Sequence, residues 1–132
     1  MTGLAPQLDP VRHGGAGLRS FLNIAELWKL SRDEQMRILD VQDPAEFEDW
    51  SANVRAHEPI EIPMEVIVRI GCVLSIYASL ETLLPGERAA EWLRAPNTAA
   101  VFGGREALDV MTSGALQDLD SVARYLLGQI HG

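Results

Sequence analysis

Apolar residues recur at helical spacing along most of the chain after residue 17, and this pattern predicts an all-α protein. The first stripe fits one helix face that spans about three turns. Its members are Leu18, Phe21, Leu22, Ala25 and Trp28. Residues 1–17 are rich in Gly and Pro and show no apolar period, so we expect a flexible leader there.

Two helix start signals follow the first stripe. Ser31 and Glu34 have the spacing of a capping box, and Asp43 precedes Pro44 as an N-cap precedes a proline in the first helical turn. These signals predict two further short helices with tight joins. Together with the first helix they suggest a region like a helix-turn-helix at residues 18–58.

The longest predicted helix begins after Pro63 and ends before Pro85. Its apolar stripe is wide enough to contact neighbours on two sides, so we expect it to be the central helix of the fold. At about 20 residues, with charges at Glu65, Arg69 and Glu81, we interpret it as too short and too interrupted to cross a membrane. Small residues at Gly71, Ala78 and Ser79 would let another helix approach closely. A short helix over Glu87–Arg94 follows.

The C-terminal stretch, residues 96–132, contains glycines at a predicted turn and at a predicted helix end. Gly103 and Gly104 predict a sharp turn, a short helix follows over Arg105–Thr112, and Gly114 would end it. A last helix carries an apolar stripe of Leu116, Leu119, Val122, Tyr125 and Leu126. We expect the five residues after Leu127 to form a small flexible tail that ends in a carboxylate.

Composition narrows the function. The 132 residues carry a net charge of −8, which argues against unspecific nucleic-acid binding and fits a partner with a basic groove. The single cysteine, Cys72, lies in an apolar segment and is expected to be a small core residue of a protein in a reducing compartment. No basic-then-apolar leader opens the chain, so a cytoplasmic location is expected.

No catalytic constellation is visible. The three histidines, His13, His57 and His131, fall in the predicted leader, a linker and the tail. There is no phosphate-binding loop, no ordered set of metal ligands and no nucleophile with an evident base. We therefore expect a protein that is not an enzyme and that needs no cofactor or metal.

The candidate groove-reading helix of the helix-turn-helix region is strongly acidic. It spans Pro44–Asn53 and contains Glu46, Glu48 and Asp49 but no Lys or Arg, although DNA-reading helices normally present basic or amide side chains. The candidate DNA-binding residues are Arg32, Arg37 and Arg55. The acidity of the candidate reader helix favours a structural unit with weakened DNA contact, and DNA binding within a dimer or larger complex stays open.

Several segments resemble the toxin-binding domain of antitoxins of the Xre/MbcA/ParS type. The similarity covers about residues 69–127, and its most specific parts are W-L-R-A-P-N and F-G-G-R-E-A-L-D-V-M-T-S-G, followed by L-D-S-V-A-R-Y-L. The resemblance implies a toxin-binding domain at residues 59–132. It also implies that the partner is a RES-domain toxin, a class that consumes NAD or transfers ADP-ribose from it, and that the antitoxin can repress its own operon as part of the complex.

The expected toxin contacts are Arg105, Leu116, Arg124, Tyr125, Gln129, Ile130, His131 and Gly132. Guanidinium groups can make forked hydrogen bonds to carboxylates of a partner, but Arg105 and Arg124 could equally form internal ion pairs with Asp109, Asp118 or Asp120. We expect the C-terminal helices to dock beside the toxin's cleft and the tail to enter or cover it.

Two other functions remain open at the level of sequence. The first is a stand-alone helix-turn-helix transcriptional regulator, and the second is a helical homodimer module without a toxin. Within an antitoxin complex we also expect a homodimer, for which the central helix or the Phe21 and Trp28 face could provide the contact.

Overall fold

The computed structural model describes residues 10–132 and, of their side chains, those from Gly14 onward. In this part of the chain seven α-helices and no strand are present, so the fold is all-α as predicted. The helices are α1 (Pro10–Leu27), α2 (Arg32–Leu39), α3 (Pro44–Arg55), α4 (Met64–Leu83), α5 (Arg88–Leu93), α6 (Ala107–Met111) and α7 (Leu116–His131).

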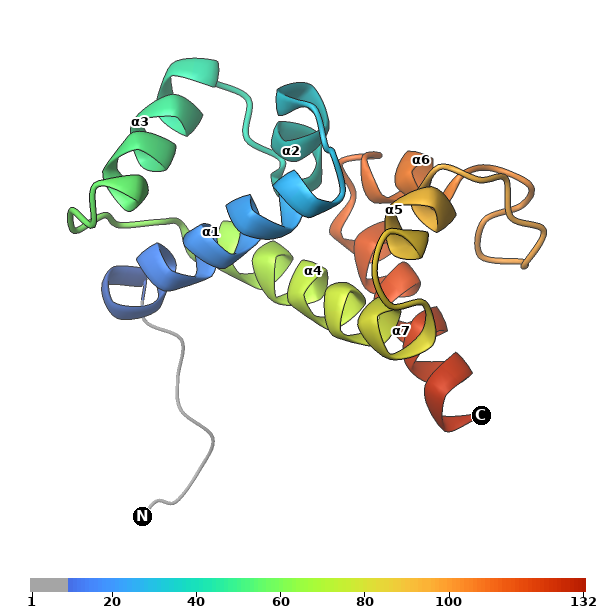
Figure 1. Cartoon of the computed structure of the whole chain (residues 1–132). Helices are drawn as coiled ribbons and strands as arrows, with labels where there is room; N and C mark the ends of the chain where they lie inside the picture. The colour runs from blue at the N-terminus through green and yellow to red at the C-terminus, as the bar shows by residue number, and fades with distance from the viewer. Residues whose placement is uncertain (1–9) are drawn as a thin grey trace, which may run out of the picture.

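The central position of α4 is confirmed. It packs chiefly against α7 and α1, while α2 touches it and α3 lies on α1 (Figure 1). By length and composition α4 would be able to cross a membrane, so our argument that it is too short was wrong. However, eight of its residues, including Ile70, Val73 and Ile76, are buried within the molecule, as in the core helix of a globular protein.

Both predicted helix starts in the N-terminal half are confirmed. Ser31 Oγ accepts a hydrogen bond from the Glu34 amide at 3.0 Å, and Glu34 Oε1 accepts one from the Ser31 amide at 2.8 Å. Asp43 Oδ1 accepts from the Ala45 amide at 2.9 Å, with Pro44 in the first turn of α3. These local bonds satisfy amides that the helix itself leaves free, which is why the sequence placed these ends correctly.

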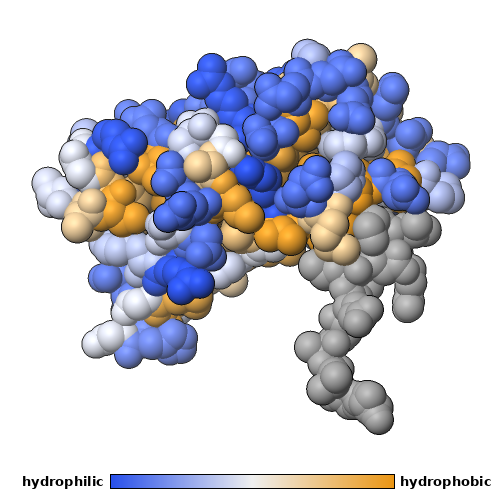
Figure 2. Space-filling view, turned by 180° about the vertical axis from the view of Figure 1, so that it is seen from behind, coloured by the Kyte–Doolittle hydropathy of each residue, from blue (hydrophilic) through white to orange (hydrophobic). Residues whose placement is uncertain are grey.

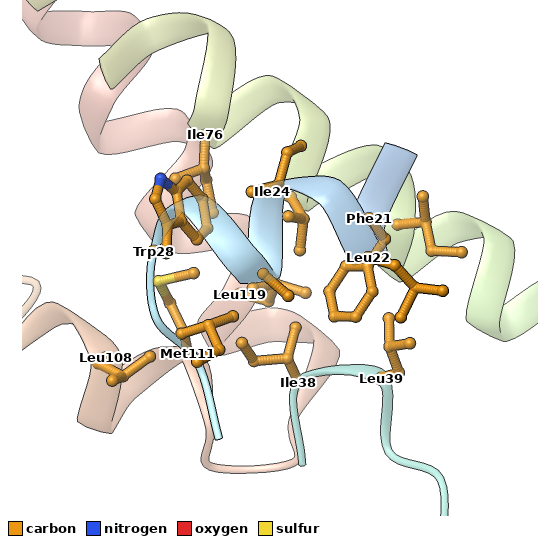
Figure 3. Packing of buried hydrophobic residues seen from close by; sticks show 14 of the residues in the cluster. Phe21, Leu22, Ile24, Trp28, Ile38, Leu39, Ile76, Leu108, Met111 and Leu119 are labelled. Carbon is orange, nitrogen blue, oxygen red and sulfur yellow. The ribbon is translucent and has the colours of Figure 1, made fainter. Parts of the chain in front are cut away.

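One apolar core unites the N-terminal and C-terminal regions. Figure 3 shows side chains from α1, α2, α4, α6 and α7 pointing into the same interior, among them Trp28, Ile38 and Met111. Phe21 is fully buried and only 2% of Trp28 is exposed, so the face that we considered for a homodimer is core.

The predicted leader is wrong for residues 10–17, because α1 already begins at Pro10; residues 1–9 lie outside the described part. Glycines there permit close packing. A Cβ at Gly14 would lie 2.9 Å from Cγ1 of Ile62, and one at Gly17 would lie 3.6 Å from Cγ2 of Ile70. A side chain at position 14 would therefore collide with Ile62, which lies just before α4, whereas a Cβ at Gly17 would make an ordinary contact.

The glycine expected to admit a neighbouring helix is not used in that way. A Cβ at Gly71 would have nothing within 4 Å, and the residue is exposed on α4. The predicted flexible tail is also wrong, because α7 continues to His131 and the Gly132 amide donates to the Gly128 carbonyl at 2.7 Å. The short helix before α7 is shorter than expected and spans Ala107–Met111.

Candidate protein-binding surface

The loop between α5 and α6 is held in a defined shape by Asn97. Its amide donates to the Arg105 carbonyl at 3.0 Å, its own carbonyl accepts from the Gly104 amide at 2.8 Å, and its side chain accepts from the Ala99 amide at 2.9 Å. Gly103 and Gly104 have φ values of 60° and 88°, so the predicted sharp glycine turn is confirmed. The loop is thus a fixed projection beside α6 (Figure 1).

An aromatic row fastens this loop to the neighbouring helices. The ring of Phe102 makes edge-to-face contacts with Trp92 of α5, with 5.7 Å between centroids, and with Tyr125 of α7, at 5.2 Å. Such pairs add about 0.5–1.5 kcal/mol beyond the area they bury. Tyr125 is half-buried, so the ring of this candidate toxin contact first serves the packing of α7 against the loop.

The two candidate arginines are exposed but differ in their contacts. Arg124 Nε lies 2.7 Å from Oδ2 of Asp120, one turn earlier on α7, so the internal ion pair that we considered is present for this residue. Arg105 Nε donates to the Phe102 carbonyl at 3.1 Å. Among the described residues no carboxylate pairs with Arg105, which leaves its guanidinium presented at the loop surface.

The remaining candidate contacts do not form one cluster. Leu116 is the first residue of α7 and is 38% exposed, whereas Gln129, Ile130 and His131 form its last turn. At 1.5 Å per residue, Leu116 and His131 lie roughly 22 Å apart along the helix. Figure 1 shows the C-terminal end of α7, which closes with Gly132, projecting beyond the body formed with α4.

Two of the three candidate DNA contacts are already engaged by carboxylates. Arg32 Nη2 lies 2.6 Å from Oε1 of Glu48 on α3, and Arg37 Nε lies 2.9 Å from Oδ2 of Asp33 on its own helix. Arg55 is exposed at the end of α3. Glu48 of α3 and Asp33 of α2 therefore reduce the positive charge available at this face.

Two arginines that the sequence did not single out join distant parts of the chain. Arg69 of α4 is 8% exposed, and its Nη1 and Nη2 donate to the carbonyls of Ile38, at 3.3 Å, and Gly114, at 2.9 Å. Oδ2 of Asp40 lies 3.8 Å from Nη2. A lone arginine within an apolar run was the available signal, because a buried charge needs partners.

Arg94 makes the second connection, from the end of α5 to the start of α2. Its two Nη atoms each lie 3.0 Å from an oxygen of Glu34, and Nη2 also donates to the Lys29 carbonyl at 3.0 Å. This forked bond to Arg94 is the main cause that lowers the pKa of Glu34, and the same bond raises the pKa of Arg94. The capping box of α2 is thereby tied to the C-terminal half.

An apolar groove lies between α1, α4 and α7 and has a volume of about 680 Å³. Figure 2 shows a broken band of hydrophobic residues on the molecular surface. Cys72 lines the groove and is only half-buried, so it is not the core residue that we expected. Partial burial is the main cause that raises the pKa of the Cys72 thiol, and the nearby Asp120 carboxylate raises it further.

These features define a small helical protein with a fixed C-terminal projection and an open apolar groove. Residues 79–132 match the family described as the antitoxin Xre/MbcA/ParS C-terminal toxin-binding domain. The chain belongs to this antitoxin type, which supports an antitoxin role with a protein toxin as the partner.

A relative in Sinorhizobium fredii (strain NBRC 101917 / NGR234), "Uncharacterized protein y4oB", is similar over nearly the whole chain. It is 34% identical over 131 residues, which cover 98% of this chain and 95% of the relative. No solved structure matches this chain. The sequence similarity to the relative therefore extends over the N-terminal helices of this chain, although the family match begins only within α4.

Proposed function

We propose that this protein neutralises a RES-type toxin, one that consumes NAD or transfers ADP-ribose, by covering the toxin's active site. The single observation that carries the proposal is that the matched toxin-binding region, residues 79–132, coincides with the fixed α5–α6 loop and the projecting end of α7. The proposal also includes a homodimer of this chain within the toxin complex, a cytosolic location, and repression of the operon by the complex.

The projecting end of α7 supports a steric mechanism. Its last turn is helical, so Gln129 and His131 are presented on a rigid end, which loses less entropy on binding than a flexible tail would. The free carbonyls at a helix C-terminus carry partial negative charge. A pocket that binds the pyrophosphate of NAD offers cationic or N–H donors. These groups would donate hydrogen bonds to the free carbonyls at the end of α7.

The side chains of Arg105 and Leu116 would provide the second part of the contact. Arg105 offers a guanidinium free of any carboxylate among the described residues, suited to an acidic group on the toxin. Leu116 is one of the exposed large apolar side chains. The helices would fix the complex, and the end of α7 would close the toxin's cleft.

Deletion of residues 128–132 tests this mechanism. The protein should be co-expressed with a RES-type toxin encoded in a neighbouring reading frame, while cellular NAD and growth are measured. The truncated chain is expected to stay folded, because the buried residues of α7 end at Leu126, and to release toxin activity. Exchange of exposed Gln117 for Ala provides the control and should leave inhibition intact.

Full inhibition by the truncated chain would contradict the proposal that the end of α7 blocks the toxin. In that case Arg105→Ala combined with Leu116→Asp should release the toxin if the helices alone inhibit. Failure of the full chain to protect against the neighbouring toxin contradicts the proposed function itself.

A further inference from the structure

We infer that the groove between α1, α4 and α7 is the surface through which two copies of this chain associate. This inference concerns the chain without its toxin. It assigns a surface to the homodimer that the proposed function includes. The apolar residues that line the groove include Val68 and Leu74 of α4 and Leu127 of α7, which are 38%, 37% and 41% exposed. Exposed apolar side chains gathered in one groove offer area that a partner can bury.

This face offers both open space and a partly exposed apolar side chain. At Gly71 a Cβ atom would meet nothing within 4 Å, so the floor of the groove is open there. At its rim Leu127 projects from α7. In a twofold dimer each surface faces its own copy, so a face with both a hollow and a projecting side chain can fill the one with the other.

Charge favours a second copy over a charged partner. The groove is lined by one acidic and one basic residue, Asp120 and Arg124, which form an ion pair with each other. Two chains that each carry −8 repel one another over most of their surfaces. In the groove one positive and one negative side chain balance, so two copies that meet there face little local repulsion, and Arg124 of one copy can exchange its own Asp120 for that of the other.

The position of the groove separates it from the toxin contact. Most of its lining comes from α1 and from α4 before residue 79, where the match to the toxin-binding family begins. Only α7 belongs to both surfaces. A dimer formed here leaves the α5–α6 loop outside the groove lining and available for another protein.

The oligomeric state of the purified chain tests the inference. Light scattering after size-exclusion chromatography should show a dimer for the wild type and a monomer for Leu127→Asp. The matched control is Leu27→Asp, which introduces the same charge at a side chain that is 61% exposed and outside the groove; it should remain a dimer. Gly71→Glu, at a helix position with open space, should also give a folded monomer.

Cys72 provides a second measurement, because it lies in the groove. Maleimide labelling of its thiol should slow as the protein concentration rises in the wild type and in Leu27→Asp, but not in Leu127→Asp. A wild type that stays monomeric with concentration-independent labelling overturns the inference, as does a dimer that survives both Leu127→Asp and Gly71→Glu.

The toxin is the other candidate occupant. If the wild type is monomeric and Leu127→Asp abolishes toxin binding, the groove holds the toxin and the inference is wrong. If the wild type dimerises as expected but fails to neutralise the toxin, the groove dimer stands and only the proposed antitoxin function fails.

Discussion

Glu34 performs two structural tasks with one carboxylate. It completes the capping box of α2 through the Ser31 amide and forms a forked bond with Arg94 from the other half of the chain. The two tasks can be separated, because glutamine preserves the capping interaction but removes the charge that Arg94 pairs with.

Replacement of Glu34 by glutamine is expected to lower the free energy of unfolding by about 0.5–1 kcal/mol at neutral pH, a modest loss because the Arg94 side chain is 41% exposed. Folding lowers the pKa of Glu34, so the unfolded chain binds the proton more tightly. The stabilisation is therefore complete above the ordinary glutamate pKa and is lost as the pH falls through the lowered value.

Urea denaturation of the wild type and Glu34→Gln across acidic to neutral pH measures this difference. The two stabilities should converge at acidic pH. Glu61→Gln, at an exposed position between α3 and α4 and outside any ion pair among the described residues, should match the wild type throughout. A difference that persists unchanged at low pH would show that the ion pair with Arg94 is not its cause.

At the scale of elements, Arg69 connects three segments that are distant in sequence. From α4 it donates to the carbonyl of Ile38 in α2 and to that of Gly114 before α7. These carbonyls come from the end of one helix and from a loop, where no helical amide follows to satisfy them. One buried guanidinium thus fixes how the N-terminal helices and the last helix sit on α4.

Exchange of Arg69 for methionine is expected to destabilise the protein by roughly 2–4 kcal/mol, because two backbone carbonyls lose a charged donor in a buried place. The midpoint of urea denaturation measures the loss. Arg37→Met is the control: its ion pair with Asp33 is exposed and within one helix, so the change should stay within about 0.5 kcal/mol. Equal losses in both variants would contradict the role assigned to Arg69.

The elements show why part of this structure was predictable. The starts of α2 and α3 follow from residues two or three positions apart, Ser31 with Glu34 and Asp43 with Ala45. The start of α1 was missed because Gly14 indicates flexibility when read alone, whereas its meaning depends on Ile62. Contacts across such separations leave no local pattern.

The same reason limits the prediction of the candidate site. The left-handed turn at Gly103 and Gly104 is local and was predicted. The bond between Arg94 and Glu34 spans 60 residues and was not. For Arg124 the sequence left a partner protein and an internal carboxylate open, and only the structure shows that Asp120 is within 2.7 Å.

At the scale of the whole molecule, the net charge opposes the DNA binding that the sequence of the N-terminal helices suggested. The sequence predicted a helix-turn-helix-like unit in the region that α1 to α3 occupy, but the chain carries a net charge of −8. Exposed Glu46, Glu48 and Asp49 would face DNA phosphates if α3 entered a groove. Since Arg32 is also paired with Glu48, the chain alone has little positive charge to release counterions from DNA.

We therefore expect the chain alone to bind its promoter DNA no more tightly than the roughly 10⁻⁴–10⁻⁶ M of unspecific binding. Gel-shift titrations at two salt concentrations measure this. Neutralising the three α3 acids as glutamine or asparagine should tighten binding and steepen its salt dependence, because Arg32 is released and phosphate repulsion falls.

A second triple variant separates the effect of the charges on α3 from the effect of the net charge of the chain. Neutralising Glu81, Glu87 and Glu91 changes the net charge by the same amount but lies at α4 and α5, away from α3. If only the α3 variant gains affinity, the acidic face of α3 is what keeps the chain from DNA, and repression must draw its positive charge from the partner. Equal gains would assign the effect to net charge alone, and tight, steeply salt-dependent binding by the wild type would contradict the expectation.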